Sequence, residues 1–374
     1  MANSRTNVHP NGSFMSNTAS HTLSFTRWLS PLVDEATFDF YARRINPTWR
    51  WSRVICRVTK IEPVAADMLA FTLKPNGNWR GFEAGQHLQV YAEINGVRHS
   101  RSYSMTNTPN PAGEIQFAVK RVPGGLVSNW LHDKLKTGDH IEIGQAFGTQ
   151  KLPCNQPLLL VAGGSGITPV MSWLQHLAHR YQHADVVLLQ YARDAATLPF
   201  QQQLAQIAAK MPNFTLQTIL TDHPGQPPIV FDDQQLTQRV PDAQRRAAFA
   251  CGPSSLTSAV RQVWQARGYT QPLLTEAFSP PALPDNSSVH PVALSYSRSG
   301  KQQQGSSGVN LLQQAEAHGL KPANGCRMGI CFSCVCKKES GTVTNLLTGE
   351  TSSEPGEMIR LCVSTPVSDV TLDL

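Results

Sequence analysis

Short segments in which apolar and polar residues alternate fill the chain between residues 51 and 147. An alternation with a period of two is typical of strands with one buried face. Several such strands, separated by glycine and proline, predict an antiparallel β-barrel or sandwich. One helix, at residues 126–135, interrupts the series. The expected strands are residues 54–63, 68–75, 87–96, 114–122 and 140–144.

From residue 156 the pattern changes to unbroken apolar runs that alternate with helical patterns. Such runs predict strands that are buried on both faces, and their alternation with helices predicts a parallel sheet covered by helices. The expected strands are residues 157–162, 184–193, 214–220, 245–253 and 271–279. The expected helices are residues 167–182, 198–211 and 255–267.

A proline- and serine-rich stretch then predicts a linker, and a third unit follows it. We expect this unit to hold two strands, the second near residues 307–308, then a helix at 310–319, a cysteine-bearing loop and further short strands. The fold class is therefore multidomain: a β-barrel, an α/β parallel-sheet domain and a C-terminal α+β domain. The predicted divisions are an N-terminal extension at 1–48, partly disordered and partly helical, domains at 49–152, 153–278 and 291–374, and the linker at 279–290.

Composition narrows the function classes. The 374 residues are 40% hydrophobic and 16% charged, which suits packed cores and excludes a disordered chain. No apolar run approaches the roughly 18 residues of a membrane span, and the polar first twenty residues show no signal peptide, so we expect a cytoplasmic protein. The net charge of +6 comes without a run of five basic residues, so no nucleic-acid partner is expected. Eight cysteines are too few for a disulfide scaffold.

Four cysteines carry the strongest chemical signal. Cys326, Cys331 and Cys334 stand in an x4, x2 spacing, and Cys362 follows later in the chain. This spacing is typical of a plant-type [2Fe–2S] cluster, with three thiolates from one loop and a fourth from a later segment. A zinc site is the alternative, but zinc ribbons favour two Cys-x-x-Cys pairs. Cys336 is surplus to the four ligands.

Residues 310–336 around these cysteines resemble the helix and cluster segment of plant-type ferredoxins. The resemblance implies a β-grasp fold for the third domain. Phe332 departs from it, because those ferredoxins usually carry a small residue there. We expect the larger side chain to shield the cluster and alter its potential.

A second signal stands at the end of a barrel strand. The tetrapeptide Arg101-Ser102-Tyr103-Ser104 resembles the RxYS motif of the ferredoxin–NADP⁺ reductase superfamily. The resemblance implies a cation for the cofactor diphosphate, an aromatic face against a flavin ring and, at Ser104, a catalytic hydroxyl near the flavin N5. The alternative is an ordinary strand end with an exposed arginine and a packed tyrosine.

A glycine-led helix start strengthens the flavin hypothesis. Glycines and free amides at a helix N-terminus favour a phosphate group, and the superfamily places the flavin diphosphate there. It places the preceding strand beside the cofactor, and FAD is favoured over FMN. The candidate residues are Val119, Lys120, Gly125, Leu126, Val127 and Ser128.

Two further segments resemble the superfamily's nicotinamide-dinucleotide motifs. Glycines at a strand-to-helix turn suit a dinucleotide diphosphate, although the spacing is neither GxGxxG nor a Walker loop. A second motif follows a later strand at its carboxyl end, where doubly wound folds bind ligands. The candidates are Gly163, Gly164, Gly166, Ile167, Thr168 and Pro169 in the first, and Cys251, Gly252 and Pro253 in the second.

Individual roles follow from the resemblance. Cys251 is expected beside the nicotinamide, with a small buried hydrophobe as the alternative, and Glu276 and Phe278 are expected near the flavin. Ser104, Cys251 and Glu276 are the catalytic candidates. Arg193, just past a strand, is placed to meet a 2′-phosphate, which favours NADPH over NADH although Asp194 stands beside it.

The three modules in this order predict an electron-transfer chain from NAD(P)H through FAD to a [2Fe–2S] cluster. The resemblance is closest to bacterial reductases of membrane fatty-acid or acyl-CoA desaturases, on residues 41–53 and 325–350. It implies a desaturase partner and a peripheral place at the inner face of the membrane. A hydroxylase or ring-hydroxylating oxygenase as the partner, a redox sensor and a plain flavin reductase remain alternatives.

A cluster of arginine and tryptophan residues precedes the barrel, namely Arg43, Arg44, Trp49, Arg50, Trp51 and Arg53. Such a cluster could contact a membrane surface. Packing onto the barrel is the favoured interpretation.

Overall fold

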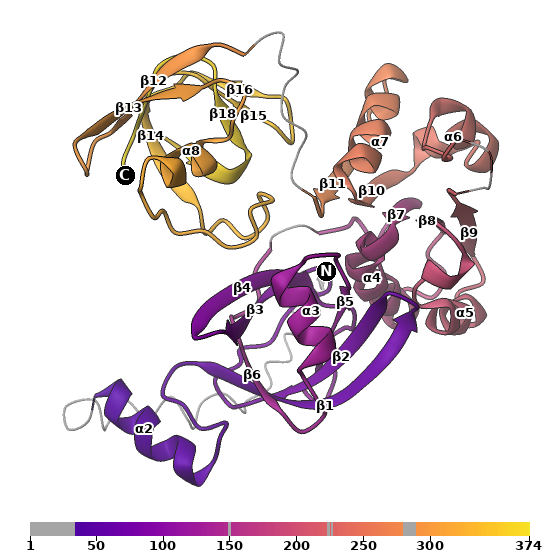
Figure 1. Ribbon diagram of the computed structural model, residues 1–374. Helices are drawn as coiled ribbons and strands as arrows, with labels where there is room; N and C mark the ends of the chain where they lie inside the picture. Colours follow the sequence, from indigo (N-terminus) through magenta and orange to yellow (C-terminus); the bar gives the residue numbers. More distant parts are fainter. Residues whose placement is uncertain (1–33, 149–150, 223–224, 226, 280–288) are drawn as a thin grey trace, which may run out of the picture.

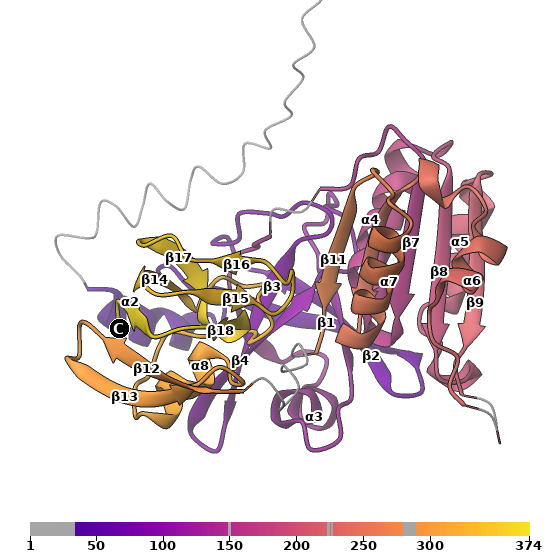
Figure 2. The ribbon, with the colours of Figure 1, turned by 90° about the horizontal axis from the view of Figure 1, so that it is seen from above.

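The computed structural model describes residues 34–148, 151–222, 225, 227–279 and 289–374, which form three modules (Figures 1 and 2). The disorder expected at residues 1–20 and most of the expected linker lie outside the described residues. The described part of the N-terminal extension contains one helix, α2 (Glu35–Ile45), which is capped by the Asp34 side chain.

The first module is the predicted antiparallel sheet, with the strand order β4-β3-β6-β1-β2-β5. A bridge between Met105 and Phe117 joins the two edges of the sheet, so that it closes into a barrel. Phe117 stacks on Phe71 in the barrel core, with ring centroids 5.2 Å apart. The elements are β1 (Val54–Ala65), β2 (Met68–Pro75), β3 (His87–Ile94), β4 (Val97–Ser104), β5 (Ile115–Lys120), α3 (Leu126–Asp133) and β6 (His140–Ile143).

The second module is the predicted parallel sheet, with the strand order β11-β10-β7-β8-β9. Alternate residues of β7 face two layers: Leu158 and Leu160 pack with α4 and α5, and Leu159 and Val161 pack with α6 and α7. The elements are β7 (Leu158–Gly163), η1 (Gly164–Gly166), α4 (Ile167–Arg180), β8 (Val186–Ala192), η2 (Ala195–Thr197), α5 (Gln201–Lys210), β9 (Phe214–Leu220), α6 (Asp233–Arg239), η3 (Ala243–Arg245), β10 (Ala247–Gly252), α7 (Ser254–Ala266) and β11 (Leu273–Ala277).

The third module is an α+β unit whose helix packs on a mixed sheet of order β13-β12-β19-β14-β17, with a small sheet β16-β15-β18 beside it. The strand expected near residues 307–308 was placed wrongly, because β13 ends before it. The elements are β12 (Pro291–Tyr296), β13 (Lys301–Ser306), α8 (Leu311–Ala317), β14 (Val335–Ser340), β15 (Val343–Asn345), β16 (Thr351–Ser352), β17 (Glu357–Arg360), η5 (Leu361–Val363), β18 (Ser364–Pro366) and β19 (Val370–Leu372).

Specific contacts hold the modules together. A side chain at Gly85 would overlap the ring of Trp173 on α4, so glycine is required where the barrel meets the second module. Beside it, Ser172 donates a hydrogen bond to the Asn107 carbonyl at 2.8 Å. Arg261 on α7 donates a hydrogen bond to the carbonyl of Leu347 in the third module. The end of β4 and the turn after β7 line one cavity with the cysteine-bearing loop.

Candidate functional site

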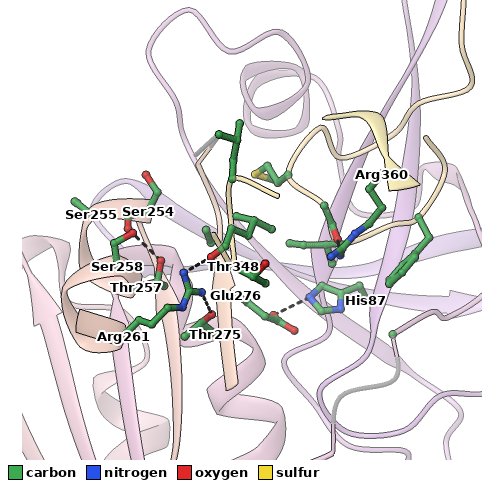
Figure 3. A pocket seen from close by; sticks show the side chains of 18 residues that line it. His87, Ser254, Ser255, Thr257, Ser258, Arg261, Thr275, Glu276, Thr348 and Arg360 are labelled. Atoms are coloured by element: carbon green, nitrogen blue, oxygen red, sulfur yellow. Dashed lines mark hydrogen bonds and ion pairs between the residues drawn. The ribbon is translucent and has the colours of Figure 1, made fainter. Parts of the chain in front are cut away.

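Two cavities lie where the three modules meet. Cavity A, of about 430 Å³, is lined by residues of the barrel, of the second module and of the cysteine-bearing loop. Cavity B, of about 460 Å³, lies between α7 and the third module and is shown in Figure 3. The sequence candidates that line cavity A are Arg101, Ser102, Tyr103, Ser104, Lys120, Gly125, Leu126, Val127, Ser128, Thr168, Phe278 and Cys326.

Strand β4 ends in cavity A with side chains that lack partners. The Ser102 and Ser104 hydroxyls are buried, and neither has a hydrogen-bond partner in the described part of the chain. Tyr103 packs its ring 5.4 Å from that of Phe117, and burial raises the pKa of its phenol. Buried hydroxyls are usually hydrogen-bonded, so these two fit a polar ligand such as a flavin.

The start of α3 forms another wall of cavity A. Gly125 is the N-cap, no side chain caps the helix, and a Cβ on Gly125 would overlap the Ser128 hydroxyl. Lys120 lines the cavity and forms a 3.3 Å ion pair with Asp67. The Val119 side chain instead lies in the barrel core. Val119 can therefore contribute to cavity A only through its backbone.

The two nicotinamide motifs lie side by side at the carboxyl ends of β7 and β10. A Cβ on Gly166 would overlap the carbonyl of Cys251, and a Cβ on Gly252 would stand 3.0 Å from the carbonyl of Gly163. Gly252 also has φ +154°, which an L side chain rarely adopts. Glycine is thus required for this close approach. Ser165 is the one residue with a side chain in the turn from Gly163 to Gly166, and it lines cavity A.

The remaining residues of these motifs have structural positions. Ile167 and Pro169 are buried at the start of α4, whereas Thr168 lines cavity A and donates a hydrogen bond to the Ser165 carbonyl at 3.0 Å. Pro253 is the residue before α7.

Cys251 and Glu276 stand opposite each other on β10 and β11. Cys251 is fully buried, and burial raises the pKa of its thiol well above the usual value. The Glu276 carboxylate lies 3.1 Å from Nε2 of His87, as Figure 3 shows, and both side chains are buried. His87 lines both cavities, and its Nδ1 has no partner among the described residues.

Sequence reasoning missed His87. The residue opens β3, is separated from Glu276 by 189 positions and carries no motif of its own. Only the folded barrel brings it to the second module. Only its position in the sequence gave a hint. His87 starts a strand two residues after Gly85, which lies where the barrel meets the second module.

The four candidate cysteines come together as two pairs. The Cys326 sulfur accepts hydrogen bonds from the amides of Met328, Ile330 and Cys331 at 3.2–3.3 Å, and the Cys331 sulfur accepts from the Cys326 amide. The sulfurs of Cys334 and Cys362 are 3.2 Å apart.

This arrangement fits a binuclear cluster better than a single ion. Within the described residues no three His, Cys, Asp or Glu side chains converge on one metal position. Two thiol pairs beside each other match two irons that each take two thiolates, and backbone amides are available to the sulfurs. Within each pair the hydrogen bond between the two thiols lowers the pKa of one cysteine, Cys331 or Cys334, and raises the pKa of its partner, Cys326 or Cys362. Thiolates are the form that binds iron.

Two nearby residues stand apart from this arrangement. The Cys336 sulfur contacts the carbonyls of Lys337 and Asp373. Phe332 has φ +57° and is 54% exposed, with the Arg360 guanidinium 4.9 Å from its ring centroid. Its side chain lines cavity B.

Arg193 lies outside both cavities. Its guanidinium forms a 3.3 Å ion pair with Asp67, the carboxylate that also pairs with Lys120. Asp67 thus links the barrel to the residue that follows β8. A phosphate at Arg193 would compete with this carboxylate.

Comparisons with known proteins identify the modules. Residues 55–151 match the oxidoreductase FAD-binding domain, residues 160–262 the oxidoreductase NAD-binding domain, and residues 296–367 the 2Fe-2S iron-sulfur cluster binding domain. An NADPH oxidoreductase of Mycobacterium tuberculosis is 32% identical over 346 residues, which cover 90% of this chain and 88% of that protein.

Two further relatives match this chain over nearly their whole length. The glycine betaine monooxygenase reductase subunit of Pseudomonas aeruginosa is 30% identical over 361 residues, covering 88% of this chain and 98% of that protein. The solved structure of phthalate dioxygenase reductase, a modular structure for electron transfer from pyridine nucleotides to [2Fe–2S], has a TM-score of 0.59 at 25% identity and covers 86% of this chain and 98% of that chain.

Fold and site together define a modular oxidoreductase with FAD, nicotinamide-dinucleotide and [2Fe–2S] modules. The chain belongs to the ferredoxin–NADP⁺ reductase family, in the group of reductases that resemble phthalate dioxygenase reductase and carry a ferredoxin domain. The described residues contain no helix with the length and apolar character that crossing a membrane requires.

Proposed function

We propose that this protein is the reductase component of an oxygenase system and delivers electrons from NAD(P)H to an oxygen-activating partner. One observation carries the proposal: Tyr103 and Ser104 of the flavin motif line the same cavity as Cys326 and Met328 of the cysteine-bearing loop. A flavin in cavity A would therefore lie against the loop that holds the cluster. The names of two relatives, reductases of a monooxygenase and of a dioxygenase, support an oxygenase as the partner.

In this proposal the residues of cavity A bind and orient the flavin. When bound, FAD converts the electron pair of a hydride into the single electrons that a [2Fe–2S] cluster carries. Tyr103 packs against the ring, and the buried Ser104 hydroxyl donates a hydrogen bond to it. Arg101, Lys120 and the start of α3, from Gly125 to Ser128, stabilise the diphosphate through charge and backbone amides.

The second module binds the nicotinamide dinucleotide. The glycine-rich turn from Gly163 to Gly166 would receive the diphosphate, and Ser165 and Thr168 line the flavin cavity. Cys251 is fully buried and lines neither cavity A nor cavity B, so it would act from beneath the site, where its carbonyl packs against Gly166. The buried Glu276–His87 pair stands at the junction of the modules and lines cavity B.

The third module holds the cluster with Cys326, Cys331, Cys334 and Cys362. Arg193 and the name of the mycobacterial relative favour NADPH as the electron donor. The desaturase partner, and with it a membrane location, has support only from the sequence resemblance at residues 41–53 and 325–350. The oxygenase partner is therefore the first choice.

Anaerobic stopped-flow absorbance of the holoprotein, mixed separately with NADPH and NADH, tests the proposal. We expect flavin bleaching to be followed by cluster bleaching, and steady cytochrome c reduction in air. A Cys362→Ser variant should keep NADPH–ferricyanide activity and lose cytochrome c reduction. If the flavin bleaches while the cluster absorbance never responds, a delivery role is wrong and redox sensing becomes the better hypothesis. Release of free reduced flavin would indicate a plain flavin reductase.

A further inference from the structure

Helix α2 and the segment after it present large apolar side chains to solvent. Phe40, Tyr41, Ile45 and Trp49 are 40%, 61%, 76% and 51% exposed. Single exposed apolar residues are normal, but four within ten positions form a patch that needs an explanation. Figures 1 and 2 show α2 at the opposite end of the molecule from α5 and α6.

Three arginines accompany these apolar residues. Arg43 and Arg44 lie over the Phe40 ring, at 5.3 and 4.3 Å from its centroid, and Arg50 donates to the carbonyls of Pro47 and Trp49. Within the described parts of the chain none of the three forms an ion pair. We define the α2 patch as Phe40, Tyr41, Arg43, Arg44, Ile45, Trp49 and Arg50.

The patch is held rigidly on the barrel. Asp39, on the buried face of α2, accepts the Trp51 amide at 2.7 Å and pairs with Arg53 at 3.1 Å. Asn76 and Asn78 donate side-chain hydrogen bonds to the carbonyls of Thr48, Arg50 and Arg53. Part of the arginine and tryptophan cluster therefore packs on the barrel, as the sequence favoured, and the rest is fixed in an outward position.

We infer that the α2 patch docks on the surface of an anionic lipid bilayer. Aromatic and branched apolar side chains mixed with arginine are the composition of helices that lie in the membrane interface. Guanidinium groups that form no ion pair among the described residues complement anionic lipid headgroups. Their long aliphatic chains let the charges stay at the headgroups while the apolar side chains enter the boundary between headgroups and acyl chains. Anchoring of this kind needs no membrane-crossing helix. The inference is independent of the proposed function, since it names a surface and not an electron acceptor.

Vesicle co-sedimentation of the full-length holoprotein tests it. The probes are vesicles of phosphatidylcholine alone and of phosphatidylcholine with phosphatidylglycerol. We expect binding to the anionic vesicles only, and weaker binding as salt shortens the Debye length, which is about 8 Å at 0.15 M. Absence of binding to anionic vesicles overturns the inference and indicates a protein partner for the patch. Equal binding to both kinds of vesicle overturns it too.

Two variants locate the contact. Arg43→Gln/Arg44→Gln and Ile45→Ser/Trp49→Ser should each weaken partitioning roughly tenfold or more. Lys134→Gln/Lys136→Gln removes the same charge elsewhere on the barrel, and Tyr181→Ser/Val230→Ser removes exposed apolar side chains from the second module. Both controls should bind like the wild type. NADPH–ferricyanide activity reports folding in every variant, and wild-type partitioning of the α2 variants would contradict the assignment.

Discussion

At the scale of single residues, the candidate site residues fall into two groups: those whose side chains line a cavity and those whose side chains are packed in a core. Ser104, Tyr103 and Thr168 reach cavity A, whereas Val119, Ile167 and Pro169 are packed in cores. The flavin motifs and Thr168 of the first nicotinamide motif meet at one cavity, and the register of each strand decides which member of a motif faces it.

Ser104→Ala should slow flavin reduction by NADPH about tenfold while FAD content is retained. The buried hydroxyl has no hydrogen-bond partner in the part of the chain that the structure describes, so its loss would remove one hydrogen bond to the ligand, which is worth about 1–2 kcal/mol. Anaerobic stopped-flow reduction measures the rate. The control is Ser100→Ala, which lies four residues earlier on the same face of β4 and outside the cavity. Reduction of the Ser104 variant at the wild-type rate would remove this residue from the catalytic candidates.

Arg193→Gln should raise the KM for NADPH about tenfold and leave the KM for NADH unchanged, because only NADPH carries a 2′-phosphate. Asp67→Asn should lower the KM for NADPH, since it removes the carboxylate that forms an ion pair with the Arg193 guanidinium. Steady-state ferricyanide reduction with both coenzymes measures the ratio, with Lys210→Gln as the surface control. A parallel rise in both KM values would show that Arg193 does not discriminate.

At the scale of elements, the sequence predicted those whose hydrophobic pattern is strong. β2 and β9 begin and end where the alternation and the apolar run predicted. β13 was misplaced because its sequence, KQQQGS, has no apolar alternation and pairs with β12 through backbone bonds on an exposed hairpin. α6 was not expected, since it buries only Leu236. Contacts between distant elements, such as His87 with Glu276, have no local pattern at all.

Lys338 on β14 also makes contacts that no local sequence pattern predicts. Its side chain is buried in the third module. Its Nζ donates to the carbonyls of Gly341, Ser352 and Glu354 at 2.9, 3.3 and 2.7 Å. Lys338→Met should destabilise this module by about 2–3 kcal/mol, since three partly buried carbonyls lose their charged donor. Urea denaturation followed by cluster absorbance measures it. The exposed neighbour gives the control, Lys337→Met, which should stay within about 0.5 kcal/mol of the wild type.

At the scale of the whole molecule, electron delivery depends on how the third module sits against the other two. Arg261 joins α7 to the Leu347 carbonyl and also donates to Thr275 at 2.5 Å. Among the described residues, the Arg261–Leu347 contact is the side-chain hydrogen bond between the second module and the third. The position of the cluster relative to cavity A therefore depends on a side chain that takes part in neither site.

Arg261→Gln should lower NADPH–cytochrome c reduction several-fold, up to about tenfold, because loss of a charged hydrogen bond reduces the population of the docked arrangement. NADPH–ferricyanide activity, which needs no cluster, should not change. Arg267→Gln, which breaks a surface ion pair with Asp233 at the end of the same helix, is the matched control. An equal fall in both activities would place the effect in the second module.

The cysteine-bearing loop forms one wall of cavity A, and this has a consequence for how the holoprotein is made. Because the third module supplies this wall, we expect a flavin to enter cavity A more readily before the cluster has ordered the loop, which predicts an order of maturation with flavin first and iron and sulfide second. Apoprotein given its cluster beforehand should take up FAD more slowly than apoprotein given FAD first, and the recovery of flavin fluorescence quenching would time the difference. The wall shared by cavity A and the cysteine-bearing loop thus predicts that the two cofactors depend on each other during assembly.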